Sequence, residues 1–131
     1  VNTDALTAAT PTGAALPAGL SIQGELGQEP SLVFTADAPE PSEPQIIVLA
    51  EGTGQEVTET DHLLYHVVIG YWGEQVYSSW TDSYQQAESG GGPETVGQRV
   101  GSRLLLVYPA DEENEIGAQA LVLDLVAAVA A

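Results

Sequence analysis

The chain has 131 residues, of which 44% are hydrophobic, so it can form one domain with a core but not two ordinary domains. Its two basic residues stand against nineteen acidic ones, a formal net charge of −17. This charge repels phosphate groups, which argues against nucleic-acid binding and against contact of the domain with an anionic membrane surface. It is typical of a protein kept soluble by charge, of adaptation to salt, or of a domain with a basic partner.

The N-terminal segment differs in composition from the rest of the chain. Residues 1–18 are rich in small residues and lack periodicity, which predicts a flexible tether. Residues 19–131 are expected to form a single domain. No apolar run is long enough to cross a membrane, and no signal peptide is recognisable, although the first residues are typical of a chain from which a signal has been removed.

Short apolar runs separated by glycine and proline predict a mostly antiparallel β fold with little helix. Two short strands are expected within 20–36, and longer strands at 45–50, 62–72, 74–80, 102–109 and 119–129.

The stretch 62–72 is the longest of these strands. Its alternate side chains point to opposite faces, and both sets are apolar, so both faces of this strand are expected to be covered. Residues 85–94 contain three glycines and are predicted to be a loop.

Four blocks follow one another in the order "VLAEGTGQEVTETDHLLYHVV", "GEQVYSSW", "VGQRVGSRLLLVYP" and "ALVLDLV". Together they resemble the FKBP-type peptidyl-prolyl isomerase domain, over roughly residues 20–127. The best match is to forms in envelope lipoproteins of actinobacteria, where a segment like "IQGELGQEPSLVF" also precedes the domain. The resemblance implies an α+β, mostly antiparallel fold in which a sheet curls around one short helix, here shortened or missing, and it implies an extracytoplasmic setting.

The resemblance also sets expectations for a binding pocket. Pockets of this family have an aromatic floor and walls with one aspartate at the rim, and they favour the twisted, less polar state of the prolyl bond. Carried over position by position, the pocket falls on His66, Val76, Tyr77 and Leu123. The floor tryptophan has no counterpart, because residues 81–95 are too short for the usual strand and helix. The resemblance therefore implies a degenerate pocket with no confidently assigned catalytic residue.

The predicted function is a pseudoenzyme-like module with little or no isomerase activity. It would bind a peptide or protein segment, proline-containing segments included, or act as a scaffold in an extracytoplasmic protein. A weak but genuine peptidyl-prolyl isomerase and a purely structural spacer remain open alternatives. A monomer without any cofactor is expected.

Aromatic residues are concentrated at one predicted hairpin, because six of the eight lie between positions 65 and 84. Tyr71, Trp72 and Trp80 are the candidate patch for a partner, since exposed aromatic residues favour binding of peptides and proteins. The alternative is ordinary packing, because strands favour aromatic side chains.

Other chemistry is weakly indicated. Ser78, Ser79, His66 and Asp82 supply the residue types of a serine hydrolase, but no G-x-S-x-G elbow is present. A half-buried histidine with one hydrogen bond is therefore the expected role of His66.

The charged residues predict no metal site. The acidic runs at 58–61 and 110–115 lack calcium-loop spacing, and with two histidines and no cysteine zinc is weaker still. Arg99 and Arg103 are the only cations, and they are expected to share one strand face and to pair weakly with surface acids.

Overall fold

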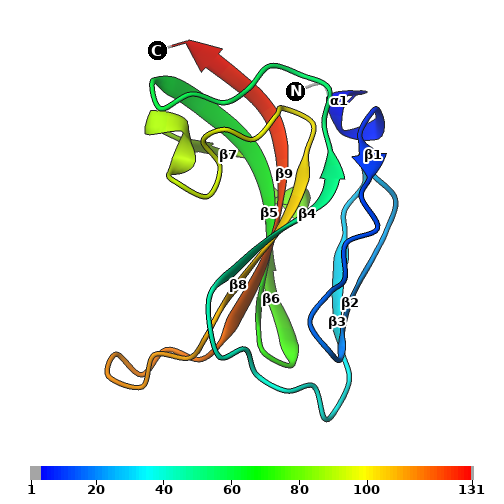
Figure 1. Ribbon diagram of the computed structural model, residues 1–131, viewed down its shortest axis with the longest axis vertical. Helices are drawn as coiled ribbons and strands as arrows, with labels where there is room; N and C mark the ends of the chain where they lie inside the picture. Colours follow the sequence, from blue (N-terminus) through cyan, green and yellow to red (C-terminus); the bar gives the residue numbers. More distant parts are fainter. Residues whose placement is uncertain (1–3, 131) are drawn as a thin grey trace.

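The computed structural model describes residues 4–130. They form a seven-stranded antiparallel sheet and a separate two-stranded hairpin. The sheet is strongly twisted along its length, and the hairpin lies to one side of it (Figure 1). The helices are short. The elements in chain order are α1 (Asp4–Thr7), β1 (Thr10–Pro11), β2 (Leu20–Gln23), β3 (Ser31–Phe34), β4 (Gln45–Glu51), β5 (Asp61–Tyr71), β6 (Glu74–Ser78), η1 (Ser79–Thr81), β7 (Gln85–Ala87), η2 (Ser89–Gly91), β8 (Arg103–Tyr108) and β9 (Gln119–Ala130).

The strand order in the sheet is β1-β4-β8-β9-β5-β6, and β7 pairs with the same outer edge of β5 as β6 does. The longest ladder joins β5 to β9, from the pair Asp61–Ala130 to the pair Tyr71–Gln119. The predicted strands are confirmed, including the two short ones that form the hairpin. The short strand β7, inside the predicted loop 85–94, was missed, because its three polar or small residues carry no strand pattern.

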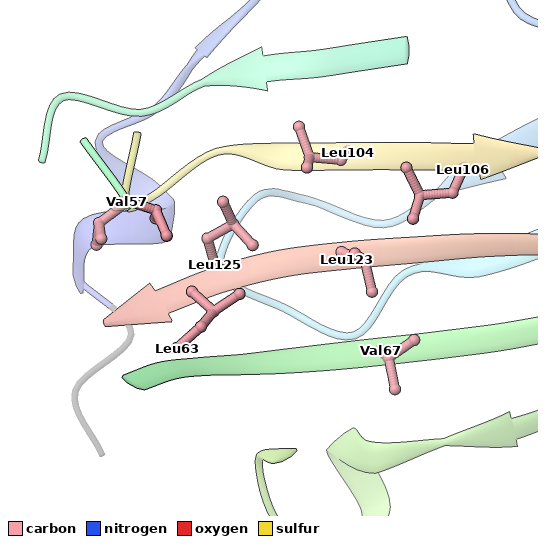
Figure 2. Packing of buried hydrophobic residues seen from close by; sticks show 8 residues of the cluster. Val57, Leu63, Val67, Leu104, Leu106, Leu123 and Leu125 are labelled. Atoms are coloured by element: carbon pink, nitrogen blue, oxygen red, sulfur yellow. The ribbon is translucent and has the colours of Figure 1, made fainter. Parts of the chain in front are cut away.

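One face of the sheet, here called the cavity face, carries the larger core cluster. Most of its side chains come from alternate positions of β5, β8 and β9, as the period of two requires. Figure 2 shows these side chains on the three neighbouring strands. The buried members of this cluster are Val57, Leu63, Val67, Val100, Leu104, Leu106, Leu123 and Leu125.

The opposite face, here called the hairpin face, is covered by the β2–β3 hairpin. Leu20 and Leu32 of the hairpin pack with buried side chains of the central strands. Gly70 marks the closest approach, since a Cβ there would lie 2.9 Å from Leu32 Cδ1. The expectation that the long strand is covered on both faces is therefore confirmed for the hairpin face, whereas on the other face Leu63 and Val67 are buried but Tyr65 and Ile69 are only partly so. The side chains of the sheet in this second cluster are Val68, Leu105, Val107, Ala120 and Val122.

The N-terminal segment, expected to be a flexible tether over residues 1–18, is packed where the structure describes it. Leu6 is 1% exposed, and β1 pairs with β4 at the edge of the sheet. The backbone N–H of Thr12 adds a bond to the Leu49 carbonyl. Burial of Leu6 and Ala9, packing of Leu16 and a few edge hydrogen bonds order the segment despite its composition, which lacks any periodic signal. Residues 1–3 lie outside the described residues.

A buried ion pair lies in the centre of the hairpin face. Arg103 Nε donates to Asp124 Oδ1 at 2.7 Å, and the two residues are 3% and 0% exposed. The guanidinium also donates to the carbonyls of Gly24, Glu25 and Gln28, at 3.4, 3.4 and 2.8 Å. Arg103 is thus not the weakly paired surface cation expected from the sequence. It ties the loop between β2 and β3 to the sheet.

Arg99 also departs from the expectation. It lies outside the strands, in an isolated bridge with Glu56, and its exposed guanidinium donates to the Gly54 carbonyl. The two arginines therefore do not share a strand face.

The ion pair makes stability depend on pH. Burial raises the pKa of Asp124 to about 6, with the Arg103 charge opposing that shift. Its second oxygen, Oδ2, is buried without a hydrogen-bond partner, which adds to the cost of the charge.

Because the folded protein binds this proton more tightly than the unfolded chain does, the contribution of Asp124 to stability is full below about pH 4. It is lost as the pH rises through about 6, by on the order of 3 kcal/mol. Urea unfolding at a series of pH values from 4 to 7 would measure this. We expect the wild-type free energy of unfolding to fall more steeply over that range than the free energy of Asp124→Asn. The exposed control Glu43→Gln should keep the wild-type slope, and parallel curves for wild type and Asp124→Asn would contradict the assignment.

Candidate functional site

A cavity of about 350 Å³ opens on the cavity face of the sheet. This volume lies at the lower end of the range of small-molecule sites, about 300–1,000 Å³. Strands β5, β8 and β9 form its base, and the segment 85–95 forms its wall. The lining residues are Leu63, Tyr65, Val67, Ile69, Tyr77, Gln85, Ala87, Gly91, Glu94, Thr95, Leu106, Tyr108, Leu121 and Leu123.

Aliphatic side chains form the base of the cavity and tyrosines stand higher in it. Leu63 and Leu106 are 1% and 5% exposed, whereas Tyr77 is 40% exposed. Gln85 Nε2 donates to the hydroxyl of Tyr77 at 3.1 Å, and the hydroxyl of Tyr108 donates to Glu94 Oε1 at 3.4 Å. The site therefore combines an apolar interior with polar groups at its outer edge, as ligand pockets commonly do.

Burial keeps two of the tyrosines neutral. It raises the pKa of Tyr65, with the nearby Tyr77 as a smaller cause. It also raises the pKa of Tyr108, with the charge of Glu94 and the hydrogen bond to it as further causes. At neutral pH these hydroxyls are therefore hydrogen-bonding groups and not anions.

A glycine-rich loop borders the cavity, as predicted for this segment. Gly90, Gly91 and Gly92 all have positive φ values, of 67°, 88° and 129°, which a continuous helix cannot accommodate. Only one turn of 3-10 helix, η2, remains. The hydroxyl of buried Thr95 donates to the Gly90 carbonyl and fixes the loop beside the cavity.

The pocket positions carried over from the family fall on both faces of the sheet. Tyr77 and Leu123 line the cavity, whereas His66 and Val76 do not. On β5, Tyr65 lines the cavity in place of the neighbouring His66. Because side chains alternate along a strand, a one-residue error moves a position to the opposite face. The alternation of β5 could have identified Tyr65, since it shares a face with Leu63 and Val67.

His66 has a structural role on the hairpin face. Its Nδ1 lies 2.9 Å from Ser79 Oγ, and its ring stacks on Trp80 with centroids 4.1 Å apart. Burial lowers its pKa, so the ring is neutral at physiological pH. The expected half-buried histidine with one hydrogen bond is confirmed.

The serine hydrolase alternative is not supported by this geometry. Ser79 is fully buried, and its hydroxyl accepts a bond from the Val67 backbone N–H at 2.8 Å. Ser78 Oγ donates to Glu29 Oε2 at 2.5 Å, and Asp82 is exposed at the end of η1. A buried hydroxyl that is bonded to the backbone cannot reach a substrate, so these serines connect η1 to the sheet.

The three residues of the proposed partner patch occupy different environments. Trp72 contacts Phe34 edge to face, with centroids 5.1 Å apart, and its indole N–H donates to the Ala38 carbonyl at 3.2 Å. Trp80 is stacked on His66 and half-buried, and Tyr71 alone is 44% exposed. The two tryptophans pack against the core of the hairpin face, as the packing alternative predicts.

The described residues contain no group of three or more histidine, aspartate or glutamate side chains that could hold a metal ion. Within the same part of the chain, no helix is long and apolar enough to cross a membrane.

Comparisons with known proteins give likenesses among solved structures. No family model and no curated protein matches the chain. Among solved structures, it is similar to a peptidyl-prolyl cis-trans isomerase of the FKBP type. That chain is named as FKBP12 from Mycobacterium tuberculosis; the identity is 24%, the match covers 72% of this chain and 90% of that one, and the TM-score is 0.48. The neighbour's name is that of the family which the four sequence blocks resemble.

The packing of Trp72 predicts that this residue belongs to the core and not to an exposed partner patch. Trp72→Ala should lower the free energy of unfolding by about 2–3 kcal/mol, since it removes a half-buried ring and a hydrogen bond. Tyr71→Ala, on the neighbouring exposed position, should cost less than about 1 kcal/mol. Urea unfolding of both variants is the measurement. Equal and small losses would show that Trp72 does not belong to the core.

Proposed function

We propose that the cavity binds an apolar, proline-containing segment of a peptide or protein, and that the domain is a binding module with little isomerase activity. The carrying observation is the cavity itself, with its aliphatic base and tyrosine edge. A domain that served only as a structural spacer would not need an open apolar cavity of this size beside its core.

Proline suits this cavity for a physical reason. Its ring is apolar and its nitrogen carries no hydrogen. An ordinary residue entering the cavity would bury a backbone N–H against leucine and valine side chains, at a cost of about 1–3 kcal/mol. A prolyl residue avoids that cost. It can place its ring against the base while its neighbours remain near the tyrosine hydroxyls.

The composition of the cavity supports binding more than catalysis. An isomerase must bind the twisted prolyl bond better than the planar one. In the family that the sequence resembles, an aromatic floor and a rim aspartate belong to that pocket. Here leucines such as Leu63 and Leu123 take the base, and Tyr77 stands where the resemblance puts the aspartate.

A genuine but weak isomerase is the second candidate, and the open cavity favours it. A pocket that had lost its role entirely could have been filled by larger side chains. Tyr65, which a position-by-position comparison with the family misses, adds an aromatic wall. A water-poor apolar site of this kind lowers the barrier to the extent that it prefers the less polar twisted state.

The proposed setting is extracytoplasmic, with the domain as a monomer in a cell-envelope protein. The support is the sequence resemblance to actinobacterial lipoproteins. Fractionation of cells that express the full-length gene would test the location, and recovery in the cytoplasm would refute it. Light scattering of the purified domain would test the monomer.

The deciding experiment is NMR exchange spectroscopy on a short Ala-Pro-Phe peptide, with the domain first in catalytic and then in near-stoichiometric amounts. Shift changes without accelerated exchange would support the binding module. Accelerated exchange at catalytic amounts would support the isomerase instead. If neither is seen, both candidates fall.

Two variants on β7 would show that the cavity is responsible. Ala87→Phe adds a ring inside the cavity and should weaken binding at least about tenfold, because it takes the space of one apolar group. Gln86→Phe adds the same ring at the neighbouring exposed position, which does not line the cavity, and should bind like the wild type. Equal effects of the two variants would place the binding site elsewhere. Circular dichroism would check that both are folded.

A further inference from the structure

Glu94 distinguishes this cavity from a purely apolar one. Among the described lining residues it alone has a carboxyl side chain, since the others are apolar, hydroxylic or amide residues. It follows the glycine run, in the turn fixed by Thr95, and it is half-buried. Its position places a negative charge next to the apolar interior.

The contact with Tyr108 orients this carboxylate. The tyrosine hydroxyl donates to Oε1 at 3.4 Å, which engages one of the two oxygens. A carboxylate has about four acceptor sites, so one long bond leaves it able to accept further donors.

Among the residues that the structure describes, no basic side chain competes for Glu94 at the cavity. The chain has two basic side chains against nineteen acidic ones. The Arg103 guanidinium is buried with Asp124 and the carbonyls of the 24–28 loop, and the Arg99 guanidinium donates to the Gly54 carbonyl. An approaching peptide therefore meets a field of one sign, which attracts cations and repels acids.

We propose that the cavity selects segments in which a lysine or arginine is adjacent to the proline. The inference rests on the proposed binding of proline-containing segments. The proline ring occupies the aliphatic base, and the neighbouring cation reaches the Glu94 carboxylate at the edge. The aliphatic base suits the apolar proline ring, which has no backbone N–H to bury. The Glu94 carboxylate suits the cation next to the proline.

Titration calorimetry with capped peptides would test this. Three peptides differ in the residue before proline: Ala-Lys-Pro-Phe, Ala-Ala-Pro-Phe and Ala-Glu-Pro-Phe. A fourth, Ala-Pro-Lys-Phe, places the lysine after it. We expect at least one lysine peptide to bind about two- to fivefold more tightly than the neutral peptide, and the glutamate peptide to bind more weakly. The differences should shrink at high salt.

Two charge-neutralising variants distinguish the effect of Glu94 from the effect of the overall negative charge of the protein. Glu94→Gln should bring the affinities of the lysine and neutral peptides together. Glu43→Gln removes the same charge from an exposed position outside the cavity and should preserve the preference.

The failures are distinguishable. Binding of the neutral peptide with no preference for lysine would overturn this inference and leave the proposed function standing. If Glu94→Gln still prefers the lysine peptides, the overall negative charge of the protein is the cause of the preference, and the role of Glu94 is overturned. If none of the peptides binds, the proposed function fails together with the inference.

Discussion

The fold depends on one buried ion pair. Arg103 and Asp124 face each other on the adjacent strands β8 and β9, and the guanidinium also holds three carbonyls of the loop within the hairpin β2–β3. Taking two charges out of water is expensive, so such a pair seldom adds net stability compared with apolar side chains. Its directed hydrogen bonds do something that leucines cannot do, since they define where the loop sits. Together with the apolar packing of Leu20 and Leu32, these bonds set the position of the hairpin and with it the closure of one face of the sheet.

Closing one face leaves the other available. On the hairpin face, His66 lies opposite Asp124 across β5 and β9, and it connects the sheet to η1 through Ser79 and Trp80. The polar residues of this face are therefore committed to structure. On the cavity face, strands β5, β8 and β9 present leucine, valine and tyrosine side chains to a space that the remaining described chain does not fill. The strict alternation of β5 separates the two roles within consecutive residues.

The glycine-rich loop explains the chemistry of the cavity wall. The positive φ values of Gly90, Gly91 and Gly92 end any helix after a single turn, and the following turn then approaches the sheet. The result is a wall that contains Glu94 and Thr95 beside an aliphatic base. The proposed ligand, a proline next to a cation, matches these two features of the cavity.

The sequence by itself determined the class of fold and the strands, because periodicity and turn residues act locally: the alternation in 62–72 and the glycines around 90 predicted their structures correctly. The sequence also predicted that Tyr77 and Leu123 belong to a pocket, and both residues line the cavity. The alternation of β5 groups Tyr65 with Leu63 and Val67 and sets His66 apart, but only the tertiary structure decided which of the two faces carries the cavity, since that depends on where the distant segments pack. Likewise, the burial of Leu6, Trp72 and Arg103 depends on segments distant in the chain, and composition carries no record of such contacts.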